Sequence, residues 1–171
     1  ERALSITGQF KHLKEKNRAL KIGLCGCMVQ QEHRKMDIKT KYPYVDFVFG
    51  TSSLHRFPQL LCEKLEKGKR LFCPEESEYL VAEGLPIRRE SNYRAWVSIM
   101  YGCNNFCTYC IVPYVRGRER SRRPEDIINE ARQMVEAGYK EITLLGQNVN
   151  SYGKNPDYNI DFGGLLRQIN D

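Results

Sequence analysis

The sequence predicts an α/β fold in two parts: the end of a parallel, doubly wound sheet domain, followed by the first βα units of a partial (βα) barrel. Short apolar, β-branched runs alternate with longer amphipathic ones, and this order is typical of parallel strands joined by helices. Polar or Gly-containing loops follow the apolar runs, where α/β sheets place functional residues. We expect the first part at residues 1–70, a linker at 71–93 and the second part at 94–171.

The first part is expected to hold a surface helix and two strand–helix units. Apolar residues spaced among Lys and Arg predict a helix within residues 2–18. Strands are predicted at 21–24 and 46–50, each followed by a helical stretch. We expect the hydroxyls of residues 51–53 to cap the second of these helices, and Gly68 to end it.

The pattern loosens after residue 69, where Pro74 and the Gly84-Leu85-Pro86 turn interrupt it, and this predicts the linker. The second part then opens with a strand at 95–100. A helix is predicted from Pro124, which suits a first helical position, to Gly138.

A second strand is predicted at 141–145, followed by a loop at 146–153 and a helix from about Phe162. Two strands are too few to close a barrel, so the sequence predicts only its beginning.

Composition limits the possible compartments and partners. No apolar run approaches the length of a membrane span, and no signal peptide pattern opens the chain, so we expect a cytoplasmic protein with no membrane partner. The chain starts at Glu1 rather than Met and is read as an excised piece of a longer protein. Its seven cysteines are an odd number, which favours metal thiolates and free thiols in a reducing compartment over a disulfide framework.

Three of these cysteines, Cys103, Cys107 and Cys110, follow the predicted strand at 95–100 with the spacing C-x3-C-x2-C. A structural zinc site uses four protein ligands, and no fourth Cys or His lies nearby. A 4Fe-4S cluster held by three thiolates keeps one iron open to bind a further ligand. The spacing therefore favours such a cluster, and a zinc site that takes a remote fourth ligand is the alternative.

The motif with Tyr109 before its third Cys resembles the signature of the radical S-adenosylmethionine (SAM) superfamily. The segments Ile111–Arg122 and Leu144–Gly153 further resemble the methylthiotransferases, and among them the tRNA-modifying MiaB type. The resemblance implies that the second part is the beginning of a radical SAM partial barrel. It also implies that the open iron binds the amino and carboxylate groups of SAM, which is then cleaved to a radical.

The same resemblance implies further cofactor contacts. Tyr109 corresponds to a position that lies against the adenine of SAM, although it could instead be a core aromatic. Gly146, Gln147 and Asn148 follow the second barrel strand, near the expected methionine end of SAM. Asn148 could instead only shape the turn.

Cys27 lies in Gly26-Cys27-Met28-Val29-Gln30, which resembles the last of three cysteine motifs that hold a second, auxiliary 4Fe-4S cluster in methylthiotransferases. That cluster is the sulfur donor. The other two motifs would lie upstream of Glu1. The alternative is an ordinary small buried thiol, which is the usual role of a lone Cys.

Arginines follow the cysteine loop at Arg116, Arg118, Arg120, Arg122 and Arg123. Such a run is often a solvated face, but beside a cluster loop it favours phosphate contact, and planar guanidinium groups suit phosphates and stacked bases. In the family, the substrate is N6-isopentenyladenosine at position 37 of tRNA, in the anticodon loop, and C2 of the base is methylthiolated. An electron donor such as a flavodoxin or ferredoxin is implied as a second partner.

Two alternatives remain open from the sequence. A methylthiotransferase of the same chemistry could act on threonylcarbamoyl-adenosine in tRNA or on a ribosomal protein, although residues 147–150 favour the isopentenyl-adenosine type. The chain could also be a zinc-containing RNA-binding module in which the arginines provide the function.

Overall fold

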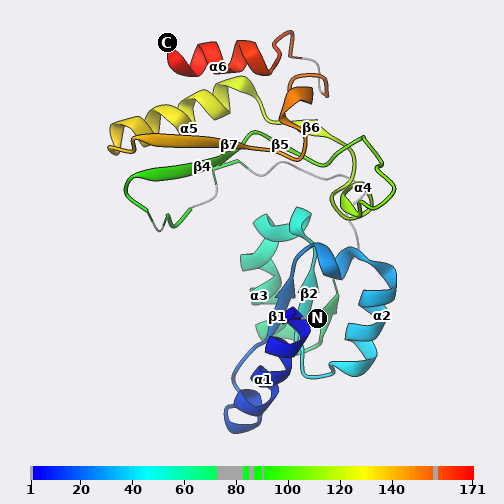
Figure 1. Cartoon of the computed structure of the whole chain (residues 1–171). Helices are drawn as coiled ribbons and strands as arrows, with labels where there is room; N and C mark the ends of the chain where they lie inside the picture. Colours follow the sequence, from blue (N-terminus) through cyan, green and yellow to red (C-terminus); the bar gives the residue numbers. More distant parts are fainter. Residues whose placement is uncertain (1, 73–82, 85–86, 90, 156–157) are drawn as a thin grey trace. The chain divides into compact units, whose positions relative to one another are not determined.

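The computed structural model describes residues 2–72, 83–84, 87–89, 91–155 and 158–171, and it divides the chain into two compact units, Glu1–Leu80 and Val81–Asp171 (Figure 1). The predicted linker at 71–93 falls largely outside the described residues, so its predicted bounds stay predictions. Within the described parts of the chain, no helix is both long enough and apolar enough to cross a membrane.

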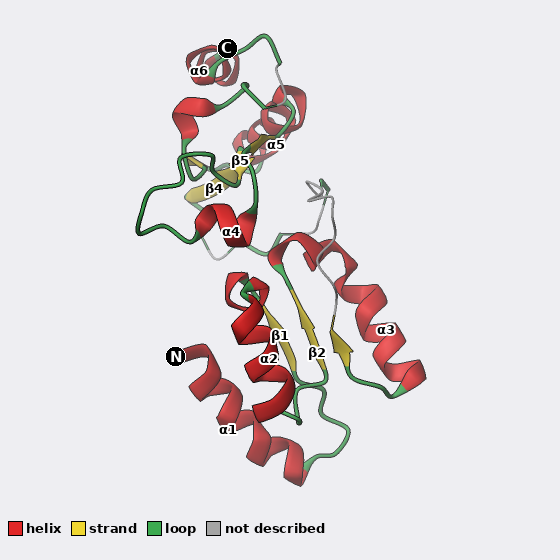
Figure 2. Ribbon diagram, turned by 90° about the vertical axis from the view of Figure 1, so that its right-hand side faces the viewer, coloured by secondary structure: helices red, strands yellow, loops and turns green. Residues whose placement is uncertain are grey.

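Unit 1 is built on a three-stranded parallel sheet in the order β1-β2-β3 (Figure 2). The strands are short, at two or three residues each. Their bounds are β1 Gly23–Cys25, β2 Phe47–Phe49 and β3 Leu71–Phe72. The helices are α1 Arg2–Lys16, α2 Glu32–Lys41 and α3 Phe57–Lys67, with the 3₁₀ turns η1 Cys27–Gln30 and η2 Thr51–Arg56. The prediction of a parallel α/β sheet in this part is confirmed.

Helices cover both faces of this sheet, because successive residues of a strand point to opposite faces. Val48 packs into one core cluster with Ile38 of α2. Its neighbours Phe47 and Phe49 pack into a second cluster with Leu60 of α3. β2 is buried at every position as a result, which is why it reads as an unbroken apolar run.

The start of α3 differs from the sequence prediction. The expected capping hydroxyls lie in η2, and the helix begins at Phe57 without a side-chain cap. Thr51 instead places its Oγ1 3.4 Å from Oε1 of Gln30. The predicted end is correct: Gly68 adopts the left-handed conformation with φ 66° and its N–H donates to the carbonyl of Lys64.

Unit 2 contains two small sheets. β4 (Arg94–Ser98) and β7 (Glu141–Leu145) pair in parallel, whereas β5 (Met100–Tyr101) and β6 (Arg120–Ser121) pair antiparallel. The helices are α4 Val112–Arg116, α5 Pro124–Glu136 and α6 Phe162–Asn170, with the 3₁₀ turn η3 Val149–Ser151. The parallel pair matches the prediction, the antiparallel pair and α4 were not predicted, and closure into a partial barrel stays a prediction.

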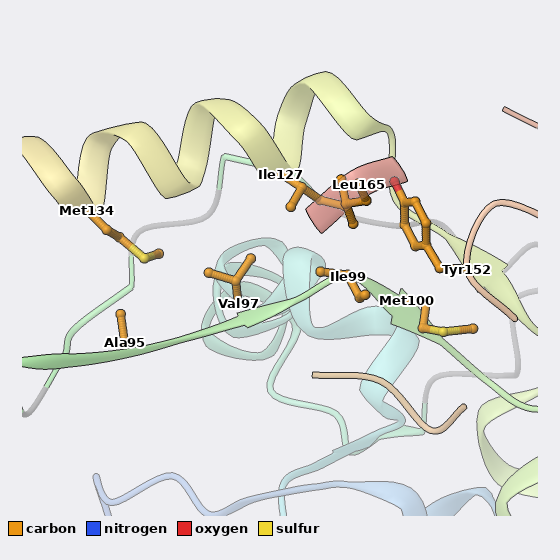
Figure 3. Packing of buried hydrophobic residues seen from close by; sticks show 8 residues of the cluster. All are labelled: Ala95, Val97, Ile99, Met100, Ile127, Met134, Tyr152 and Leu165. Atoms are coloured by element: carbon orange, nitrogen blue, oxygen red, sulfur yellow. The ribbon is translucent and has the colours of Figure 1, made fainter. Parts of the chain in front are cut away.

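One face of the β4–β7 pair is covered by helices. Ala95, Val97 and Ile99 point from the strand segment toward α5 and pack with Ile127, Met134, Leu165 of α6 and Tyr152 (Figure 3). Ile99 is fully buried and separates β4 from β5. Its N–H donates to the carbonyl of Leu145, and its own carbonyl accepts from the N–H of Arg122. The single strand predicted at 95–100 therefore changes pairing partner at this residue, from β7 to β6.

Candidate cluster and cofactor site

The cysteine loop leaves β5 through a narrow neck. Gly102 has φ 74°, and a Cβ at this position would lie 2.1 Å from the carbonyl oxygen of Arg118. The N–H of Cys103 donates to the carbonyl of Gly117 at 3.3 Å, which ties the first cysteine to the returning chain. A residue other than glycine does not fit at 102, so the neck depends on close backbone approach.

The three thiols differ in exposure. Cys103 is buried beside the neck, Cys110 is half-buried, and Cys107 is exposed. A turn in which the N–H of Cys110 donates to the carbonyl of Cys107 at 2.9 Å brings the last two together in the backbone. Among the described residues, no group of three or more His, Cys, Asp or Glu side chains forms a possible metal site. The predicted ligands therefore share one loop without converging on a point.

The chemistry of this donor set nevertheless fits a cluster with one open iron. All three cysteines are free thiols on one loop, and thiolates are the ligands that iron–sulfur clusters prefer. Residues 104–109, which include Cys107, are exposed, so the middle of the loop is not part of a hydrophobic core. We therefore keep Cys103, Cys107 and Cys110 as predicted ligands.

The aromatic residues of the loop lie on its surface. Tyr109 is 90% exposed, which excludes a core role for it in this chain. Phe106, with φ 45°, places its ring edge-on to that of Tyr114 at 5.8 Å between centroids. The predicted contact of Tyr109 with the adenine of SAM stays a prediction, and its exposure leaves the ring free for stacking.

The loop after β7 lies directly against the strand that delivers the cysteines. A Cβ on Gly146 would come within 2.4 Å of Cγ of Met100, so the small residue is needed for this approach. Gln147 is exposed, and Asn148 donates from Nδ2 to Oγ of Ser151 at 2.6 Å. This bond lies within the turn, but the backbone of Asn148, with φ −151°, is not left-handed, and the predicted SAM contacts of Gly146, Gln147 and Asn148 stay predictions.

The five arginines separate into surface and interior residues. Arg118 and Arg123 are exposed. Arg120 is half-buried, and its guanidinium donates to the backbone carbonyls of Arg118 and Arg116 in the same segment.

The position of Arg122 contradicts the prediction that this residue contacts tRNA. Only 8% of it is exposed, and its guanidinium is bonded to the carboxylates of Glu83 and Glu130. Burial disfavours its charge, but these two carboxylates outweigh burial and raise the pKa of Arg122 above its usual range. A buried guanidinium with carboxylate partners is not available to phosphate.

Cys27 also follows a strand, separated by one residue from the parallel strand β1 of unit 1. It opens η1 after Gly26, is half-buried and forms no disulfide. Cys25, at the end of β1, has its Sγ 3.9 Å from the carbonyl of Gly50, and burial, with a further contribution from Cys27, raises its pKa. The auxiliary-cluster role of Cys27 remains a prediction.

Three functional neighbours of this site were missed by sequence reasoning. Glu83, Glu130 and Tyr152 each contact Arg122, and Tyr152 is 1% exposed. Glu83 lies in the predicted linker and Glu130 on a polar face of α5, so neither pattern indicated a buried partner. Tyr152 lies in the Leu144–Gly153 segment, and its aromatic side chain was the one feature of the sequence that could have indicated a buried partner.

Part of the chain matches a known protein family. Residues 97–170 match the family described as "Radical SAM superfamily". This range runs from β4 through the cysteine loop and α5 to α6 and includes both loops described above. The chain therefore carries a radical SAM segment, as the cysteine spacing predicted.

Three relatives bear the name "tRNA-2-methylthio-N(6)-dimethylallyladenosine synthase". One from Clostridium perfringens (strain SM101) is 57% identical over 164 residues, which is 96% of this chain and 37% of that protein. Relatives from Clostridium botulinum (strain Eklund 17B) and Thermoanaerobacter sp. (strain X514) are 56% and 55% identical, over 96% and 99% of this chain and 36% of each relative. The chain thus spans little more than a third of the length of these relatives. These matches confirm the predicted resemblance to the radical SAM methylthiotransferases.

Proposed function

We propose that this chain is part of a radical SAM tRNA methylthiotransferase that methylthiolates C2 of N6-isopentenyladenosine at position 37 of tRNA. The observation that carries the proposal is the set of three free thiols, Cys103, Cys107 and Cys110, on a loop fixed at the end of a strand, within a radical SAM segment. The names of the related proteins support the proposed substrate.

In this proposal each loop has one task. Cys103, Cys107 and Cys110 hold a 4Fe-4S cluster, and when bound this cluster supplies the electron for reductive cleavage of SAM. Tyr109 offers an exposed ring to the adenine, and the Gly146–Asn148 loop borders the methionine end. Cys27 contributes one ligand to the auxiliary cluster.

Charge and exposure support the proposed contact with tRNA. Arg118 and Arg123 are exposed and suited to tRNA phosphates of the anticodon loop, with Arg116 and Arg120 beside them, and Arg122 is removed from this set. A flavodoxin or ferredoxin is the proposed electron donor. None of the six described cysteines forms a disulfide, which supports the proposal of a reducing, cytoplasmic location.

The test is anaerobic reconstitution of this chain with iron and sulfide, followed by metal analysis and electron paramagnetic resonance with and without SAM. We expect about four irons at this site and a reduced spectrum that SAM perturbs. Cys107→Ala should lose the SAM-sensitive signal. Cys62→Ala, which removes another exposed free thiol on α3, is the matched control and should retain it.

Two results would overturn the proposal. Binding of zinc in place of iron would favour the RNA-binding module. A reconstituted cluster whose reduced spectrum does not change when SAM is added would contradict the proposed radical SAM chemistry. If both readouts agree with the proposal, assays with isopentenyl-adenosine tRNA, threonylcarbamoyl-adenosine tRNA and a ribosomal protein substrate decide between the methylthiotransferase types.

A further inference from the structure

Arg122 joins parts of unit 2 that are distant in sequence. Its Nε donates to Oε1 of Glu83 at 2.7 Å, and its Nη1 donates to Oε2 of Glu130 on α5 at 2.8 Å. The same Nη1 donates to the carbonyl of Ser98, the last residue of β4, at 2.6 Å. Glu130 also accepts from Arg89 at 2.9 Å. The guanidinium is therefore the centre of a charged network that joins β4, α5 and the segment before β4.

The backbone of Arg122 connects this network to both loops of the site. Its N–H donates to the carbonyl of Ile99 at 2.9 Å, beside the strand that leads to Cys103. Its carbonyl accepts from the hydroxyl of Tyr152 at 2.8 Å. The neighbouring Ser121 accepts at Oγ from the N–H of Gly153 at 2.9 Å. One short segment thus touches the base of the cysteine loop and the end of the 146–153 loop.

We propose that Arg122 is a positioning residue that holds the cysteine loop and the 146–153 loop in fixed register. This inference rests on the proposed function, because the two loops border the cluster and the methionine end of SAM in that proposal. In that proposal, SAM binds only when the cysteine loop and the 146–153 loop are held in a fixed position relative to each other. The fold of unit 2 does not itself require this fixed position.

The chemistry of the residue suits this task. A guanidinium presents its donors in one plane and reaches two carboxylates and a carbonyl at once, which an ammonium on a flexible stem does not do. Burial raises the pKa of Tyr152, so its hydroxyl stays protonated and remains a donor to the Arg122 carbonyl. The carboxylates of Glu83 and Glu130 compensate the buried positive charge of Arg122.

The experiment compares Arg122→Lys with Arg70→Lys. Arg70 is a matched control in unit 1, since its guanidinium also bonds to backbone carbonyls, those of Lys39, Ile38, Tyr42 and Val45. Both variants keep the charge and lose the planar fork. The chain is reconstituted anaerobically, and the apparent Kd for SAM is obtained from the SAM-dependent change in the reduced spectrum.

We expect Arg122→Lys to keep its irons and to bind SAM at least about tenfold more weakly, while Arg70→Lys stays within about twofold of the parent chain. Hydrogen exchange on the chain without cluster gives a second readout. Arg122→Lys should accelerate exchange both at the N–H of Cys103 and at the N–H of Gly153, and Arg70→Lys at neither.

Tyr152→Phe is the second variant, because it removes only one hydroxyl and keeps the buried ring. We expect it to weaken SAM binding by about three- to fivefold and to accelerate exchange in the 146–153 loop, so it carries the test if Arg122→Lys does not fold. The inference is overturned if Arg122→Lys or Tyr152→Phe binds SAM like the parent, or if Arg70→Lys weakens it equally. If SAM does not change the spectrum of the parent chain, both the proposed function and this inference are overturned.

Discussion

Each unit of this protein has a cysteine-bearing loop that follows a strand, the parallel strand β1 in unit 1 and the antiparallel strand β5 in unit 2. In unit 1, Cys25 and Cys27 flank Gly26, which has φ 136° and no atom within 4 Å of the place where a Cβ would stand. In unit 2, the loop from Cys103 to Gly117 starts at Gly102, whose missing Cβ leaves room for the backbone of Arg118. The first turn is shaped by its own dihedral angles, and the second by a distant segment packed against it.

Buried charge shows the same difference. In unit 1, Asp46 bonds to Lys14, to Lys64 at 3.1 Å and to the N–H of Ile22, and this group fastens α1, α3 and the entry to β1. In unit 2, Arg122 is the centre and its partners lead to the proposed site. The buried ion group of unit 1 therefore joins elements of the fold, whereas the group around Arg122 also contacts the segments that lead to the cysteine loop and the 146–153 loop.

The largest expected effect is that of Gly102→Ala. The added Cβ would clash with backbone at a positive φ, so we expect unit 2 to lose more than about 4 kcal/mol of unfolding free energy. The single tryptophan, Trp96, lies in β4, and its fluorescence in a urea titration reports this unit. Gly26→Ala is the control. It should lower the unfolding free energy of unit 1 by about 2 kcal/mol, because alanine at this positive φ is strained but does not clash. Equal losses in the two variants would contradict the difference between the loops.

Next comes Asp46→Asn, which leaves Lys64 buried without its carboxylate. We expect a loss of about 3 kcal/mol in unit 1, because an uncompensated buried charge is costly. Circular dichroism follows both units, and Trp96 fluorescence should show no change in unit 2. A shift of the tryptophan transition by the same amount would show that the two units do not unfold independently.

Acid should weaken unit 1 through the same residue. Burial opposes ionisation of Asp46, but hydrogen bonds from Lys14, the Ile22 N–H and Lys64 outweigh burial and lower its pKa. A carboxyl whose pKa is lower in the folded state stabilises fully above its unfolded pKa of about 3.9, and this stabilisation is lost as pH falls through the folded value. Urea midpoints at pH 6 and pH 3 should therefore differ in the parent and differ less in Asp46→Asn.

The smallest effect on stability is expected for Tyr109→Ala. Its side chain is 90% exposed, so unfolding should change by less than about 0.5 kcal/mol. Tyr152→Ala is the contrast, since it empties a buried site and should cost about 3 kcal/mol or more. If Tyr109→Ala destabilised unit 2 strongly, the surface position of the cysteine loop would be wrong.

Much of the fold was predictable where the pattern is local. The helix from Pro124 and the end of α3 at Gly68 each follow from residues within one element, and the parallel pairing of β1 with β2 follows from the strand–helix–strand order. The antiparallel β5–β6 pair was not predictable, because its residues lie about twenty positions apart and neither strand alternates long enough to be recognised. The cysteine ligands were predicted from spacing, but their separate exposures were not.

The sequence by itself indicated the class of this protein, because C-x3-C-x2-C and its flanking segments resemble those of the radical SAM methylthiotransferases. The tertiary structure decided which arginines face solvent. Arg122 stands in a basic run that looks uniform, yet Glu83 and Glu130 remove it to the interior. The physical reason is that a charge enters the interior only where opposite charges from distant segments compensate it, and no local pattern records those segments.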